Sequence, residues 1–225
     1  MMNLSKSYDF FKPEEHKERI HIVGCGSVGS TVAENLARCG ITNMVLWDFD
    51  RVEAKNVANQ MFRDEDVGKL KVDALEEIIC SINPGAEKNI VKKPDGWKGE
   101  KMSGFIFMCV DSVDCRKQII ELHEYDMNVR AVFDFRTLLT GAQHYAADWT
   151  DYKMKENLKN SLDFTQEEAE ASAPMSACGE TLGVVTTVRL VSAMGVNNYI
   201  NFVKGNGIWK FVNIDGFYGI LDCFN

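Results

Sequence analysis

The glycine-rich turn at residues 24–29 is the feature that most limits what this chain can fold into. It reads G-C-G-S-V-G and directly follows a short apolar run at residues 20–23. Behind the turn, apolar residues recur at helical spacing as far as Gly40. A strand, a tight glycine turn and a helix in this order predict the first unit of an α/β fold.

The alternation of strands and helices continues along the chain. Further strands are expected at residues 43–47, 89–91, 105–109, 129–135 and 143–149, and helices at 67–82, 116–124 and 182–203. Such alternation predicts a Rossmann-like α/β fold, with a mostly parallel sheet, flanking helices and right-handed crossovers. We expect a C-terminal antiparallel hairpin of residues 208–214 and 217–221 around Asp215-Gly216.

Residues 1–225 are interpreted as a single domain. Within it, residues 150–177 are polar and acidic, with scattered apolar positions. We expect this segment to form a long crossing loop with one short helix. A connection of this length usually has a function or is mobile.

Composition excludes several classes of function. The chain has 225 residues and a net charge of −8, so it has no sequence-wide basic surface for nucleic acid. It has no uncharged apolar run of membrane-spanning length and no signal-peptide pattern, which disfavours secretion and membrane spanning and predicts a cytoplasmic protein. The seven cysteines include no C-x-x-C pair, which indicates a reducing compartment and predicts no structural zinc.

The glycine turn and Asp48 together predict a nucleotide site. Glycines in such a turn let backbone N–H groups approach phosphates, which the helix N-terminus attracts. Asp48 ends the second expected strand, about 20 residues further on, where a carboxylate can hold ribose hydroxyls. The alternative is a turn that only packs the helix against the strand, with Asp48 capping the strand end. NAD and ATP both fit these residues.

The segment after Asp48 separates the two nucleotides. It contains D-x-D-x-V-E at residues 48–53, N-x-x-x-Q at 56–60 and G-x-x-K at 68–71. This order resembles the adenylylating family of ubiquitin-activating enzymes, which includes ThiF and MoeB. The resemblance extends from Ile20 to the last strand.

The resemblance implies that ATP lies over the glycine turn and that Mg²⁺ assists. It assigns the nucleotide to Gly24, Gly26, Ser27 and Gly29, its ribose to Asp48, its phosphates to Asn56, Asn59 and Lys71, and the Mg²⁺ to Asp111. Lys71 has an independent rationale, because a lysine beside a phosphate cradle supplies charge as pyrophosphate leaves. The alternatives are a solvated surface lysine at Lys71 and a helix N-cap at Asp111.

Two positions bear on catalysis. Asn59 stands where the family pattern has an arginine, so either Lys69, Arg51 or another basic residue compensates, or the chain adenylylates poorly. Cys178 lies where family members can carry an acyl-accepting cysteine, and a thiol near a helix N-terminus can be a good nucleophile. The alternative for Cys178 is a partly buried structural thiol. Cys25 and Cys109 are expected to pack under the nucleotide.

The resemblance implies an ATP-dependent activating enzyme that acts with a small ubiquitin-like or sulfur-carrier protein. The carrier's C-terminal carboxylate would be adenylylated, and a competent Cys178 would then take the acyl group as a thioester. The family also implies a homodimer. The rival hypotheses are a non-catalytic scaffold or binding protein, which Asn59 motivates, and an NAD(P)-dependent oxidoreductase, which would leave Lys71 and the Asn56 segment without a purpose.

Overall fold

The computed structural model describes residues 2–177 and 181–225, and it begins with the expected strand, turn and helix. Strand β1 (Ile20–Val23) leads through the glycine turn into helix α1 (Ser27–Arg38), and the chain returns in β2 (Met44–Trp47). Both β1 and β2 are completely buried, because they lie in the interior of the sheet. Short apolar runs are typical of such strands.

The sheet has eight strands in the order β3-β2-β1-β4-β5-β6-β7-β8. The remaining strands are β3 (Val91–Lys93), β4 (Gly104–Met108), β5 (Val129–Leu138), β6 (Gly141–Asp148), β7 (Phe211–Asp215) and β8 (Ile220–Phe224). The first five strands pair in parallel, and β6, β7 and β8 add to β5 in antiparallel fashion. The mostly parallel sheet and the C-terminal antiparallel hairpin are thereby confirmed.

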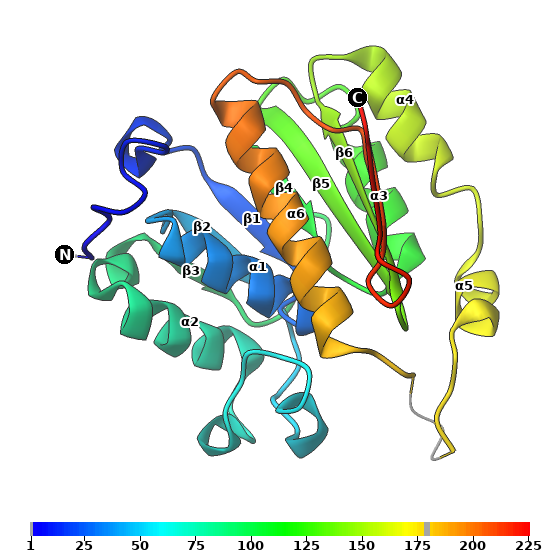
Figure 1. The fold of residues 1–225 in the computed structure, drawn as a ribbon, viewed down its shortest axis with the longest axis horizontal. Helices are drawn as coiled ribbons and strands as arrows, with labels where there is room; N and C mark the ends of the chain where they lie inside the picture. Colours follow the sequence, from blue (N-terminus) through cyan, green and yellow to red (C-terminus); the bar gives the residue numbers. More distant parts are fainter. Residues whose placement is uncertain (1, 178–180) are drawn as a thin grey trace.

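Helices cover both faces of this sheet (Figure 1). They are α2 (Lys71–Ile82), α3 (Val113–His123), α4 (Tyr152–Asn160), α5 (Gln166–Ser172) and α6 (Val185–Val203). One core cluster joins α1, α2 and α6 to the sheet, and a second joins α3 and α4 to its other face. Alternate residues of β1, β2 and β4 enter different clusters, as Ile22 and Val23 do in β1.

Several boundaries differ from the sequence-based expectation. A 3₁₀ helix (Pro84–Asn89) occupies the start of the expected third strand, because Pro84 fixes a helical first turn there. The C-terminal strands begin three residues later than expected, at Phe211 and Ile220. In the turn between them, Asp215 accepts the amides of Phe217 and Tyr218, which delays the start of β8.

The crossing segment contains two helices, α4 and α5, where one was expected. Asp151 caps α4 by accepting the amides of Lys153 and Met154, and Thr165 begins a capping box with Glu168 in α5. Leu158 of α4 is buried against the sheet. None of the described helices has the length and apolar character needed to cross a bilayer.

Candidate functional site

The carboxyl ends of β1, β2 and β4 meet at one edge of the sheet, and the glycine turn lies there. Gly24 has a positive φ of 90°, and a Cβ at this position would lie 2.8 Å from the carbonyl oxygen of Cys109. A Cβ on Gly29 would lie 1.8 Å from the carbonyl oxygen of Gly24. Both glycines are therefore required by the backbone itself, which must fold back closely past the end of β4.

Gly26 is different, since a Cβ there would meet no atom within 4 Å. It is the N-cap of α1, and no side chain among the described residues caps the helix. The space beside Gly26, at the start of α1, is therefore open. An uncapped helix start over a glycine turn can accept an anionic group such as a phosphate.

Asp48 is buried beside the turn. Its Oδ2 accepts the amide of Cys25 at 2.7 Å, and its Oδ1 accepts the amide of Asp50 at 2.8 Å. Burial raises the pKa of Asp48, and the two amide hydrogen bonds and Lys71 oppose that rise. The carboxylate thus holds the glycine turn to the end of β2, and its remaining lone pairs are the ones that a ribose hydroxyl would use.

Lys71 is the first residue of α2 and is 7% exposed. Its Nζ lies 2.7 Å from Oδ2 of Asp50. Burial raises the pKa of both Asp48 and Cys25, and the charge of Lys71 opposes that rise. A buried lysine aimed at the turn is not the solvated surface residue of the alternative interpretation. Asp50 is a site residue to which the sequence analysis gave no role, although its spacing of two from Asp48 was a signal.

The Asn56–Gln60 segment lies against the start of α1. Ser30 of α1 accepts the amide of Met61 at 3.2 Å, and Asn56 accepts the amide of Glu53 at 2.8 Å. In the described structure, buried Oδ1 of Asn59 and Oε1 of Gln60 have no hydrogen-bond partner. Unpartnered buried polar atoms are rare, and here they adjoin the glycine turn's helix, where a ligand would satisfy them.

The two basic residues considered as substitutes for the family arginine are engaged elsewhere. Lys69 Nζ lies 3.0 Å from Asp66 and 2.6 Å from Glu77. Arg51 Nη1 donates to the carbonyl oxygen of Gly68 at 2.8 Å. Asn59 therefore has no cationic replacement from Lys69 or Arg51 in this arrangement.

Asp111 follows β4 and is exposed, with no side-chain hydrogen bond or ion pair in the described part of the chain. The alternative interpretation of Asp111 as the N-cap of the following helix is wrong, because Ser112 is the N-cap and accepts the amide of Cys115 at 3.1 Å. Gln166 of α5 accepts the amide of Val113 at 2.8 Å. The crossing segment is thus attached to the helix start beside Asp111.

Two thiols, those of Cys25 and Cys109, lie near the turn. Burial raises the pKa of Cys25 and of Cys109, which keeps both thiols protonated. Cys25 is fully buried, which agrees with a packing role. Cys178, the expected acyl acceptor, lies outside the described residues.

The described residues contain no group of three or more His, Cys, Asp or Glu side chains arranged to hold a metal ion. A Mg²⁺ bound mainly by phosphate oxygens and water needs no such group, and one free carboxylate is enough protein ligand for it. Asp111 is such a carboxylate. The open turn, the uncapped helix, Lys71 and Asp111 together fit a Mg²⁺-bound nucleoside triphosphate.

The fold and this edge of the sheet define a Rossmann-like α/β domain, and comparison with protein families agrees. The ThiF family model matches residues 14–222, which include every described residue of the site. The chain therefore belongs to the ThiF family.

Relatives include two proteins named ubiquitin-like modifier-activating enzyme 5. The protein of Dictyostelium discoideum is 35% identical over 115 residues, which cover 44% of this chain and 30% of the relative. The protein of Oryza sativa subsp. japonica is 48% identical over 65 residues, which cover 29% of this chain and 15% of the relative. The matches thus span less than a third of these relatives.

Solved structures share the fold at low sequence identity. The structure of E. coli MccB with MccA has a TM-score of 0.75 and 16% identity, over 95% of this chain and 65% of that one. The structure of E. coli MccB with ATP has a TM-score of 0.69 and 17% identity, over 95% and 65%. PaaA has a TM-score of 0.65 and 17% identity, over 92% and 63%.

Proposed function

We propose that this chain is an ATP-dependent activating enzyme that adenylylates the C-terminal carboxylate of a small ubiquitin-like or sulfur-carrier protein. The observation that carries the proposal is the ThiF match, which runs through the glycine turn, Lys71 and Asp111. The names of the relatives point to the same chemistry.

In the proposed reaction, a carboxylate oxygen of the carrier attacks the α-phosphorus of ATP. The bond from that phosphorus to the bridging oxygen breaks, and pyrophosphate leaves with the negative charge. Gly24, Gly26, Ser27 and Gly29 would hold the nucleotide and Asp48 its ribose. Such catalysis consists of positioning and of charge stabilisation by fixed groups.

The phosphates would be bound by Asn56, Asn59 and Lys71, and Asp111 would hold Mg²⁺, which neutralises phosphate charge when bound. Lys71, at the start of α2, would exchange its contact with Asp50 for one with the triphosphate. Where Cys178 accepts the acyl group, its thiolate sulfur attacks the adenylate carbonyl, AMP leaves and a thioester forms.

ATP–pyrophosphate exchange tests the proposal. The chain is incubated with Mg²⁺–ATP, labelled pyrophosphate and candidate carrier proteins, and we expect exchange only with a carrier whose C-terminus is intact. The matched control is the same carrier without its last two residues. Stabilisation of the chain by NAD and not by Mg²⁺–ATP would overturn the proposal and favour the oxidoreductase hypothesis.

A non-catalytic binding protein is a second candidate, and one observation favours it. Asn59 replaces the arginine of the family pattern, and neither Lys69 nor Arg51 is free to supply the missing charge. In that case Mg²⁺–ATP stabilises the chain, and no carrier elicits exchange.

The proposed partner arrangement is a homodimer in the cytoplasm, as the family resemblance implies. Size-exclusion chromatography with light scattering measures the oligomeric state directly. A monomer at micromolar concentration, with exchange activity retained, would separate catalysis from dimerisation.

A further inference from the structure

A large cavity lies at the edge of the sheet opposite the glycine turn. Its lining includes Arg19, Asn43 and Asn89, which precede β1, β2 and β3, so it adjoins the amino ends of the parallel strands. Its volume is about 1180 Å³, and small-molecule sites usually occupy roughly 300–1,000 Å³. No step of the proposed reaction uses it.

The N-terminal segment, residues 2–18, forms one wall and is firmly attached. Phe11 is buried in the core, and Lys204 of the α6 C-cap donates to the carbonyl oxygen of Phe10 at 2.6 Å. At Gly40 a Cβ would lie 2.7 Å from Pro13 and 2.8 Å from Leu4. Because a glycine is needed for this close approach, the wall is a built part of the fold.

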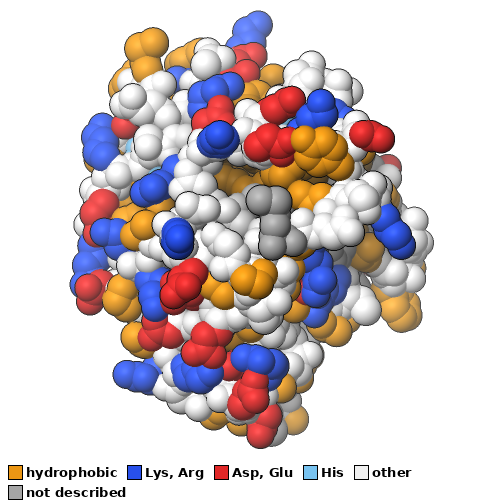
Figure 2. Space-filling model, turned by 90° about the vertical axis from the view of Figure 1, so that its left-hand side faces the viewer, with side chains coloured by type: hydrophobic (Ala, Val, Ile, Leu, Met, Phe, Trp, Pro, Cys, Tyr) orange, Lys and Arg blue, Asp and Glu red, His pale blue; other side chains and the backbone are white. Residues whose placement is uncertain are grey.

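The cavity has an apolar part and a charged rim. Apolar side chains of Met2, Leu4, Pro13 and Ile41 contribute to its lining. The face in Figure 2, which carries the N-terminal segment, shows hydrophobic side chains gathered at a hollow, with charged side chains of both signs around it. A site of this kind binds an organic body and a charged group together.

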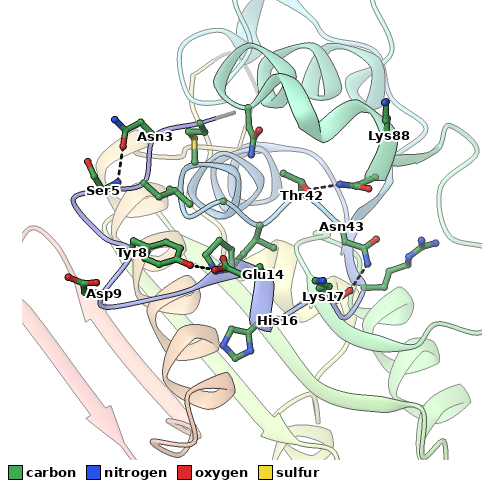
Figure 3. Close-up of a pocket in the computed structure, with 18 residues that line it drawn as sticks. Asn3, Ser5, Tyr8, Asp9, Glu14, His16, Lys17, Thr42, Asn43 and Lys88 are labelled. Carbon is green, nitrogen blue, oxygen red and sulfur yellow. Dashed lines mark hydrogen bonds between the residues drawn. The ribbon is translucent and has the colours of Figure 1, made fainter.

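The charged groups are divided between two walls (Figure 3). Asp9 lies on one side of the cavity, and Lys17, from the end of the N-terminal segment, lies on the other side with Lys88, Thr42 and Asn43. Glu14 is already engaged, because it accepts a hydrogen bond from the Tyr8 hydroxyl, which lowers the pKa of Glu14.

The cationic wall is unusual for this acidic chain. Arginine and lysine side chains with no hydrogen bond, ion pair or ring contact in the described structure are Lys6, Lys17, Arg19, Lys88, Lys153 and Lys210. Half of them line this one cavity. Nearby, the side-chain amide of Asn43 donates to the carbonyl oxygen of Lys17, and that of Asn89 donates to the hydroxyl of Thr42. The side-chain oxygens of both asparagines can therefore accept hydrogen bonds from hydroxyl groups of a ligand.

We propose that this cavity is a second binding site, which takes a small organic phosphate monoester. Arg19 recognises the phosphate through its planar guanidinium, and the flexible lysines Lys17 and Lys88 close on it. A phosphate monoester carries about −1.5 to −2 charges at neutral pH. It therefore balances three cations better than a ligand with a single carboxylate would. The organic body rests on the apolar lining beside Ile41.

The test uses phenyl phosphate as the probe on the full ¹⁵N-labelled chain at low salt, with benzoate and inorganic phosphate as comparison anions. We expect saturable amide shifts at residues 17–19, 41–43 and 88–89, with benzoate at least about tenfold weaker. The double variant Arg19→Gln with Lys88→Gln is expected to bind phenyl phosphate about tenfold or more weakly than the parent chain.

The matched control is Lys153→Gln with Lys210→Gln, which removes two other unpartnered cations and is expected to leave the affinity unchanged. Lys71→Ala is also expected to leave it unchanged, so failure of this site and failure of the ATP site are distinguishable. Shifts confined to residues 24–29, equal weakening in both double variants, or benzoate binding as tightly as phenyl phosphate would overturn the proposal. If inorganic phosphate binds as tightly as phenyl phosphate, the apolar lining contributes nothing to binding, and the proposal of an organic phosphate ligand is wrong.

Discussion

The ammonium group of Lys71 and the carboxylate of Asp50 lie 2.7 Å apart, across the gap between the end of β2 and the start of α2. A positive charge at a helix N-terminus is unfavourable because of the helix dipole. Asp50 offsets that cost and holds the ammonium group near the glycine turn, where it also acts on Asp48. The ion pair thus positions the Lys71 ammonium group at the proposed nucleotide site in the absence of a ligand.

Replacing Lys71 with alanine is expected to weaken Mg²⁺–ATP binding by about tenfold or more, because a charge-assisted contact to phosphate is lost. Isothermal titration calorimetry measures the change. Lys92→Ala is the matched control, since Lys92 also pairs with acids of α2, Asp73 and Glu76. Equal loss of affinity in the two variants would show that Lys71 acts only through the stability of α2.

Two glycines of the turn are expected to respond differently to alanine. Gly26→Ala places a methyl group in open space, so the chain folds with near-normal stability and binds Mg²⁺–ATP more weakly. Gly29→Ala places a Cβ 1.8 Å from the carbonyl oxygen of Gly24, which should cost about 3 kcal/mol of the free energy of unfolding. Thermal unfolding with and without Mg²⁺–ATP measures both effects. A Gly26→Ala chain with normal ATP binding would contradict the nucleotide assignment.

Restoring the family arginine tests whether Asn59 limits turnover. Asn59→Arg is expected to raise the rate of ATP–pyrophosphate exchange by roughly tenfold or more, because an arginine supplies a charge-assisted contact to the phosphates. Asn59→Ala is the control for loss of the side chain and should give no gain. If Asn59→Arg lowers the rate in an active chain, the asparagine is adapted to this site.

Stability is expected to fall as the solution is acidified from about pH 6.5 to pH 4. Burial lowers the pKa of His144 to about 4, from an ordinary value of 6.5. Above pH 6.5 the imidazole is neutral in both states. Between pH 6.5 and 4 the unfolded state binds the extra proton, so the folded state loses stability, by at most roughly 3 kcal/mol.

Urea unfolding at several pH values measures this slope. His144→Gln is expected to flatten it, apart from the contribution of His21, whose pKa burial also lowers to about 4. A variant with the slope of the parent chain would exclude His144 as a source of acid lability.

Asp134 is expected to be essential for stability, since it is fully buried between two arginines. It lies 3.0 Å from Arg116 and 2.7 Å from Arg136. Asp134→Asn leaves both cations without their anion, which should cost about 3–5 kcal/mol. Asp222→Asn, on the exposed strand β8, is the control and should change the free energy of unfolding by less than about 0.5 kcal/mol. A small effect at Asp134 would mean that water reaches the cluster.

Much of the parallel half of the sheet was predictable from local pattern. Strand β1 is a short apolar run before a glycine turn, and the turn itself has few backbone solutions. The start of β3 was not predictable in the same way, because Pro84 begins a 3₁₀ helix that extends to Asn89 and buries Ala86. Helices α4 and α5 were partly missed because their polar sequences give little apolar periodicity, although Asp151 and Thr165 are clear caps.

Site residues that belong to a sequence motif were predictable one by one. Site features that depend on a contact between distant segments were not. The placement of Lys71 near Asp48 agrees with the motif order, although the assigned roles remain predictions. The contact of Gln166 with the Val113 amide joins segments 53 residues apart, and no local pattern signals it. The engagement of Lys69 with buried Asp66 likewise depends on how the loop before α2 folds.

The central position of β1 in the sheet determines how a bound ligand would change amide hydrogen exchange. Every residue of β1 pairs with both β2 and β4, whereas β8 pairs on one side only and is exposed throughout. Amide hydrogens of β1 should therefore exchange with solvent among the slowest, through global opening, and those of β8 among the fastest. A nucleotide held at the end of β1 would slow exchange across the whole sheet.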